Sequence, residues 1–151
     1  MRRLRVGLVL LVGCLGLAGC DEKLSSIAGP TPNLEPTFSS IQREIFQSAD
    51  SSGRPACAQS QCHAPGGSGV RRGNLDLSPA VAYSSLVNVP ARRKPGAIRV
   101  IPGDPENSFL TQKLAGGPGL VDERMPDGGP YLTDSQIRII RRWIEIGAPN
   151  N

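Results

Sequence analysis

The sequence has few of the residues that usually build a catalytic centre or a large core. Its 151 residues include one histidine, two methionines, one tryptophan, two tyrosines and three phenylalanines. No phosphate-binding loop and no pair of catalytic carboxylates stands out, and no apolar run reaches the about 20 residues that a membrane-spanning helix needs. No stretch alternates apolar and polar residues as half-buried strands do. The sequence therefore gives no sign of catalysis, of a spanning helix or of a sheet.

Glycine and proline, in contrast, are abundant. The chain has 18 glycines and 14 prolines, well above their usual share in globular proteins. Such a composition favours short helices joined by long ordered loops. The core that the protein can build from its own side chains is then thin, and a buried cofactor would help to fill it.

The charge balance does not indicate a nucleic-acid partner. The sequence has 17 basic and 13 acidic residues, but three of the basic ones are arginines in the N-terminal segment described next. The 14 that remain nearly balance the 13 acidic residues, so the chain lacks the basic excess of a nucleic-acid-binding domain. The basic runs at 71–72 and 92–94 are typical of solvated loops, and docking of an acidic redox partner is the weaker interpretation.

The first residues have the pattern of an export signal. Three arginines precede an apolar run over 6–18, as in a secretory signal peptide. The run ends in Leu-Ala-Gly-Cys at 17–20, which resembles the lipobox of bacterial lipoproteins. This resemblance implies lipidation at Cys20 and anchoring to the inner or the outer membrane, facing the periplasm. The alternatives are an ordinary cleaved signal and an N-terminal anchor helix.

The expected division of the chain is a lipoprotein signal peptide over 1–19, a membrane tether over 20–36 and one domain over 37–149. Three prolines in a polar stretch mark the tether. The remaining length is enough for one core and too short for two.

Apolar spacing and helix-start residues predict four helices in an all-α domain. They begin near Phe38, at Ser78, at Asp104 and at Thr133. Ser78 and Asp104 are each followed by proline, which is a common pairing of an N-cap with the first helical position. Thr133 has glutamine three residues later, as in a capping box, and this last helix is expected to end at Gly147.

The most informative motif is the segment from Cys57 to His63. It has two cysteines, and a histidine follows the second at once, which is the attachment pattern of haem c. Two thiols can add to the two vinyl groups of a haem, and the adjacent imidazole can then ligate the iron. The usual spacing puts two residues between the cysteines, whereas Cys57 and Cys62 are separated by four. The two additional residues must loop out if both sulfurs are to reach the vinyl groups.

Met125 supports the same interpretation independently. It is the only methionine after the export signal, and His63 is the only histidine. Histidine and methionine are a common pair of axial ligands in c-type cytochromes. Met125 also precedes a proline in a glycine-rich segment just before the last expected helix. We therefore expect Met125 to be the second iron ligand, opposite His63.

Over residues 46–147 the chain resembles the single-haem cytochrome c domains of exported proteins from environmental bacteria. The resemblance implies an all-α, class I cytochrome c-like fold with short helices and long loops around one covalent haem c. It also implies electron transfer between an unidentified dehydrogenase and an oxidase or reductase, without enzymatic activity. It lies in these stretches: Cys62-His63-Ala64, Gly73-Asn74-Leu75-Asp76-Leu77, Tyr83-Ser84-Ser85-Leu86-Val87, Pro102-Gly103-Asp104-Pro105 with Ser108 and Leu110, Arg124-Met125-Pro126, and Gln136 through Trp143 to Ala148.

Other interpretations of the motif carry less weight. A disulfide between Cys57 and Cys62 would suit an oxidising compartment and would make the protein a structural or interaction module. A zinc site needs about four ligands, and only three candidates lie close together in the sequence. A peroxidase needs an open iron position, which Met125 would fill. A cysteine nucleophile needs a separate histidine base, but the only histidine adjoins Cys62.

Overall fold

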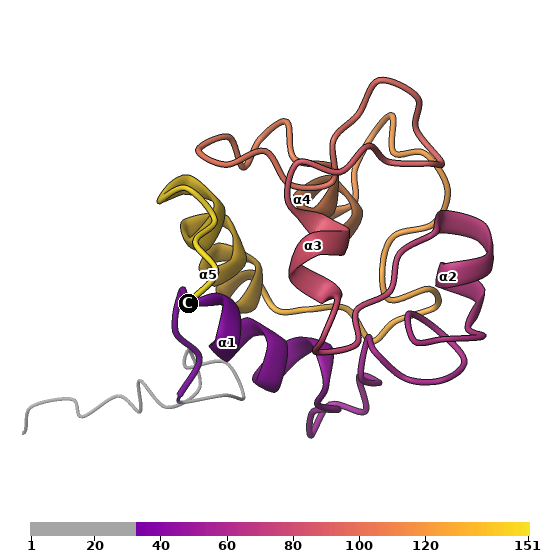
Figure 1. The fold of residues 1–151 in the computed structure, drawn as a ribbon. Helices are drawn as coiled ribbons and strands as arrows, with labels where there is room; N and C mark the ends of the chain where they lie inside the picture. Colours follow the sequence, from indigo (N-terminus) through magenta and orange to yellow (C-terminus); the bar gives the residue numbers. More distant parts are fainter. Residues whose placement is uncertain (1–32) are drawn as a thin grey trace, which may run out of the picture.

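The computed structural model describes residues 33–151 (Figure 1). The expected signal peptide, the lipidation residue Cys20 and most of the tether lie outside the described residues. The end of the tether is described and contacts the domain. There the Glu35 backbone N–H donates to Ser40 Oγ (3.0 Å), and Leu34 packs against the hydrophobic core.

Five short α-helices and one π-helical segment make up the regular structure of residues 33–151. In chain order they are α1 (Phe38–Ile41), the π-helical η2 (Gln42–Phe46), α2 (Ser68–Gly73), α3 (Ala82–Leu86), α4 (Phe109–Ala115) and α5 (Asp134–Glu145). None of these helices is long and apolar enough to cross a membrane.

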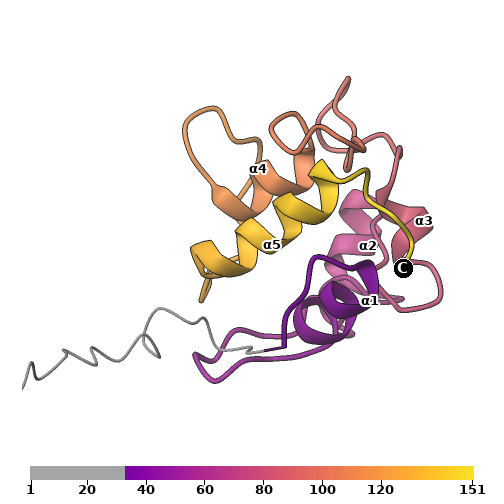
Figure 2. The same cartoon turned by 90° about the vertical axis from the view of Figure 1, so that its left-hand side faces the viewer.

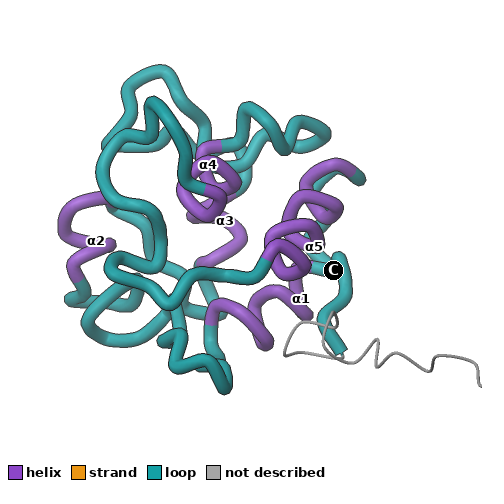
Figure 3. Tube along the Cα trace, turned by 180° about the vertical axis from the view of Figure 1, so that it is seen from behind, coloured by secondary structure: helices purple, strands orange, loops and turns teal. Residues whose placement is uncertain are grey.

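The expected all-α, class I cytochrome c-like fold is wrong for the described residues. Only about a third of them is helical, and loops make up most of the rest (Figure 3). The long loop between α3 and α4 folds back on itself through three isolated β-bridges rather than through helices. The physical cause is the glycine and proline content, because proline lacks a backbone donor and ten of the described glycines adopt positive φ angles that helices do not use.

The core forms where α1 and η2 meet α5 (Figures 1 and 2). The Phe38 ring lies 5.1 Å from the Tyr83 ring and 5.5 Å from the Trp143 ring, measured between centroids. The C-terminal tail closes this side of the core, since the Phe38 backbone N–H donates to the Asn151 side chain (3.0 Å) and Trp143 Nε1 donates to Pro149 O (2.9 Å). The apolar side chains buried in this region include Ile41, Ile45, Phe46, Ile137, Ile140 and Ile144.

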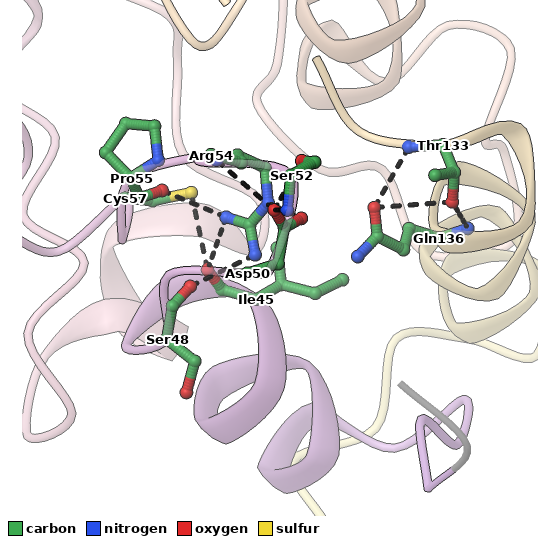
Figure 4. Close-up of polar contacts among 9 residues, drawn as sticks. All are labelled: Ile45, Ser48, Asp50, Ser52, Arg54, Pro55, Cys57, Thr133 and Gln136. Carbon is green, nitrogen blue, oxygen red and sulfur yellow. Dashed lines mark hydrogen bonds and ion pairs between the residues drawn. The ribbon is translucent and has the colours of Figure 1, made fainter. Parts of the chain in front are cut away.

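The last helix confirms the sequence prediction. Thr133 and Gln136 form a reciprocal capping box at the start of α5, as Figure 4 shows. The helix ends before Gly147, whose φ of 100° suits a residue without a side chain. On its other side α5 packs against α4 (Figure 2).

The helix starts predicted at Ser78 and Asp104 are wrong by about one helical turn. Helix α3 begins at Ala82 and α4 at Phe109, several residues after Ser78 and Asp104. Ser78 O instead accepts a turn hydrogen bond from the Val81 N–H (3.0 Å). The Asp104 carboxylate accepts from the Asn107 N–H (3.1 Å), so it caps a turn that does not continue into the helix.

Candidate functional site

One cavity of about 540 Å³ brings all four candidate cofactor residues together. Cys57, Cys62, His63 and Met125 line it, although the motif and the methionine come from opposite ends of the domain sequence. Its volume lies within the range of about 300–1,000 Å³ typical of small-molecule and cofactor sites. Its wall is mainly apolar, with side chains that include Phe46, Leu75, Leu77, Leu86, Phe109 and Leu110.

A hydrogen bond to the backbone fixes the orientation of the His63 ring. Its Nδ1 lies 3.1 Å from the Leu75 carbonyl oxygen, and because a carbonyl only accepts, Nδ1 is the donor. The backbone supports the same contact, since the Leu77 N–H donates to His63 O (2.7 Å). Burial lowers the pKa of His63, and the hydrogen bond to Leu75 acts in the opposite direction. The neutral imidazole therefore keeps an unprotonated Nε2, which is the form that ligates metals.

Two glycines make room for the histidine. A Cβ atom on Gly69 would lie 2.2 Å from His63 Nδ1, and a Cβ on Gly67 would lie 2.1 Å from the carbonyl oxygen of Cys62. Both distances are far below van der Waals contact. The start of α2 thus passes directly against the imidazole and against the residue before it. No buried side chain belongs to α2, although the helix also lines the cavity with Arg72.

The two cysteines are free thiols in the structure. The backbone between them loops out, and the His63 N–H closes this loop by donating to Cys57 O (3.0 Å). Burial raises the pKa of the Cys57 thiol to about 11, with the nearby Arg54 acting in the opposite direction. Cys57 is therefore a neutral thiol at pH 7, and its Sγ donates to Ile45 O (3.6 Å).

Met125 lies in the loop between α4 and α5 and is half-buried. Its backbone N–H donates to Lys113 O (2.8 Å), and the side chain of the preceding Arg124 donates to Leu114 O (2.8 Å). Both acceptors belong to the last turn of α4. The loop is therefore anchored to the helix, and the Met125 thioether lines the cavity that His63 also lines.

The cavity wall also contains a buried cation that the sequence did not lead us to expect. Arg99 is 6% exposed and donates to the carbonyl oxygens of Ser85 (2.5 Å), Gly73 (2.7 Å) and Asn74 (3.0 Å). No carboxylate within residues 33–151 pairs with Arg99. The sequence did hold a sign of it, because Arg99 interrupts an otherwise apolar stretch over 97–101. A charge in such a stretch is rarely buried without a partner or a ligand.

The remaining charges around the cavity are more exposed. Four are basic, namely Arg72, Arg92, Arg93 and Lys113, and three are acidic, namely Asp122, Glu123 and Asp127. Arg93 and Asp122 form an exposed ion pair (2.8 Å). These exposed groups thus include carboxylates close to the basic residues, whereas Arg99 has no carboxylate partner within residues 33–151.

The described part of the chain does not offer a zinc site. Residues 33–151 contain no group of three or more histidine, cysteine or carboxylate side chains that could hold a metal ion. A metal would need either an external chelate or a ligand of another type, such as a thioether. No protein-family model, no curated protein and no solved structure matches this chain.

Proposed function

We propose that this protein is an electron carrier that holds one covalent haem c and is anchored to a bacterial membrane by a lipid on Cys20. Cys57 and Cys62 attach the haem through thioethers, and His63 and Met125 are the axial ligands of the iron. The redox partners are a dehydrogenase and an oxidase or reductase on the periplasmic side. The protein itself has no enzymatic role.

The convergence of four residues on one cavity carries the proposal. The chain has one histidine, and one methionine after residue 20, and both line the cavity with Cys57 and Cys62. The hydrogen bond from His63 Nδ1 to Leu75 O leaves Nε2 as the ligating atom. The glycines at 67 and 69 let the start of α2 pass directly against Cys62 and the ring of His63, where any Cβ would clash. The residues present therefore fit a haem c.

The unpaired cation Arg99 supports the same ligand. An arginine has five N–H donors, and Arg99 uses three of them on carbonyl oxygens. A haem carries two propionate carboxylates, which are the usual partners of a guanidinium. A carboxylate bound beside Arg99 would supply the counter-ion that the described chain lacks.

The chain's contribution to electron transfer is to hold the iron's ligands and to exclude water. A bound haem supplies an iron that changes between the ferric and ferrous states. His63 and Met125 would both hold the iron, which would leave no position for a substrate, and the ligands would not need to exchange during transfer. The apolar wall limits the access of water, and the methionine thioether raises the reduction potential by favouring ferrous iron.

The second candidate function is a structural or interaction module with a disulfide between Cys57 and Cys62. An oxidising compartment favours it, although both thiols are free in this structure. The two functions predict different masses for the peptide that carries both cysteines.

We expect the full chain, produced in a host with c-type maturation machinery, to contain a tryptic peptide that is one haem heavier than its formula. Thioethers resist thiol reductants, so dithiothreitol should leave this mass unchanged. A disulfide would instead give a peptide two hydrogens lighter, and reductant would restore them. A colourless product with the disulfide mass, made where a control cytochrome matures normally, would overturn the proposal.

A further inference from the structure

A buried ion pair lies directly beside Cys57, outside the set of residues that would touch the haem iron. Arg54 is fully buried, and its Nε donates to the Asp50 carboxylate at 3.0 Å. The side chain of Asp50 is 5% exposed. Asp50 also accepts from Ser52 and from the Arg54 backbone N–H (3.2 Å), which closes the turn over 50–54. Burying such a pair is costly unless its hydrogen bonds are complete.

The guanidinium of Arg54 also donates to three backbone carbonyls. Nη1 donates to Ile45 O (3.2 Å) and Pro55 O (3.0 Å), and Nη2 donates to Ser48 O (3.0 Å). Figure 4 shows these bonds radiating from one side chain. Ile45 belongs to η2, whereas Pro55 is two residues before Cys57. Arg54 therefore ties the segment that leads into the motif to the end of η2.

The Cys57 thiol shares one of these acceptors. Its Sγ donates to Ile45 O (3.6 Å), the same oxygen that accepts from Arg54 Nη1 (Figure 4). Cys62 has no comparable anchor, because its Sγ only accepts from the neighbouring Gln59 side chain (3.2 Å). The bond from the His63 N–H to Cys57 O (3.0 Å) fixes the backbone at Cys57, but it does not orient the thiol. The contact that orients the Cys57 thiol is the one to Ile45 O, which lies outside the loop between the cysteines.

We propose that Arg54, paired with Asp50, is a positioning residue that presents the Cys57 thiol to a haem vinyl group. The inference rests on the haem function proposed above and concerns one of its two attachment bonds. In that step the S–H adds across the vinyl C=C. A sulfur–carbon bond forms, the thiol hydrogen goes to the other vinyl carbon, and no oxidant or reductant is consumed. By holding Cys57 in place, the Asp50–Arg54 pair would compensate for the four residues that separate the two cysteines.

The test compares how often each cysteine is bonded to haem in the full chain matured in the same host. Free thiols are alkylated in denaturant, and the fragment masses of the haem-bearing peptide locate the label and give the fraction in which Cys57 is alkylated. In Arg54→Gln this fraction should rise roughly tenfold over wild type, as expected for loss of a charged hydrogen bond, while Cys62 stays bonded. The ferrous absorption band should move to its position in Cys57→Ala, which keeps one thioether. Arg54→Lys should restore part of the Cys57 attachment.

Two further variants distinguish an effect on the position of the Cys57 thiol from a general loss of protein stability. Arg142→Gln removes an exposed ion pair with Glu145 and should leave the ratio of the two attachments unchanged. The double change Asp50→Asn with Arg54→Gln leaves no buried charge unpaired, so it preserves the measurement if Arg54→Gln alone does not accumulate. An unchanged ratio, or an equal loss at both cysteines, would overturn the inference. Wild type without haem would instead overturn the proposed function.

Discussion

The backbone around Met125 is fixed independently of its side chain. The Met125 N–H bonds to Lys113 O, and Arg124 bonds to Leu114 O. Neither bond involves the thioether, and the side chain is only half-buried. A change of side chain at this position therefore leaves the loop anchored to α4. This property lets iron ligation be separated from folding at a single residue.

We expect Met125→Leu to lower the reduction potential, because leucine keeps the volume of methionine but has no sulfur to stabilise ferrous iron. Met125→Ala should lower the potential in the same direction and should also shift the ferric spectrum towards high spin or solvent ligation. Protein voltammetry and absorption spectra of both variants check this. An unchanged potential together with an unchanged ferric spectrum in Met125→Leu would mean that Met125 is not an iron ligand.

Single residues also show where sequence reasoning reaches its limit. Cys57, Cys62, His63 and Met125 could be chosen from the sequence because their chemistry is unusual and the chain has so few of them. Arg54 and Arg99 could not be chosen in this way. Their partners are mostly backbone carbonyls, including those of Ile45, Gly73 and Ser85, and carbonyls have no residue-specific signature. Only the folded chain brings these acceptors to the two arginines.

Among the elements, α2 shows why a helix beside the candidate site can lack the apolar spacing and the cap that would predict it. It has no buried residue and no side-chain cap, so neither apolar periodicity nor capping predicts it. It ends at Asn74, whose φ of 51° is a left-handed cap. Its second residue, Gly69, passes against the ring of His63. The helix is therefore specified by a tertiary contact, whereas α5 was predictable because its cap and apolar stripe are local.

We expect Gly69→Ala to impair the site and Arg71→Ala, on an exposed part of the same helix, to leave it intact. A Cβ at residue 69 would lie 2.2 Å from His63 Nδ1, whereas Arg71 is exposed and does not line the cavity. Overpacking of this kind costs about 1–3 kcal/mol, and the imidazole would have to turn away from Leu75 to relieve it. Haem content and urea unfolding of both variants check this. Equal haem content in the two variants would contradict a need for glycine beside the ligand.

The prediction of the fold class was wrong because the lengths of individual helices were not predictable. Ser78 and Asp104 have the residue types of helix caps, yet each begins a turn that comes before its helix. Local rules predict that a turn begins there but do not determine whether it continues. The glycines and prolines between helices end each one within a few turns at most, and three β-bridges organise the longest loop instead. The sequence pattern thus predicted α5 fully, predicted the helices near Phe38, Ser78 and Asp104 only in part, and did not predict α2.

At the scale of the whole molecule, the segment before α1 and the segment after α5 both contact the start of α1. The C-terminal residue Asn151 bonds to Phe38 and to Ser39 at the start of α1. The segment before α1 is also attached, because Ser40 Oγ donates to Asn33 O (3.3 Å). The described chain therefore enters and leaves the domain beside α1 (Figure 1). An anchor upstream of residue 33 would hold the domain from this side.

We expect Cys20→Ala to abolish lipid attachment and to shift the protein away from the membrane fraction. The reason is the sequence Leu-Ala-Gly-Cys at 17–20, together with the about 0.8 kcal/mol that each buried CH₂ group of an acyl chain contributes to anchoring. Cys14→Ala is the matched control, since it removes a cysteine from the same apolar segment without touching the expected acceptor. Labelling with a radioactive fatty acid, followed by fractionation, checks both variants. Haem content should be equal in wild type, Cys14→Ala and Cys20→Ala, because the cavity is formed by residues from 46 onwards. Equal fatty-acid labelling of Cys20→Ala and wild type would show that Cys20 is not the acceptor.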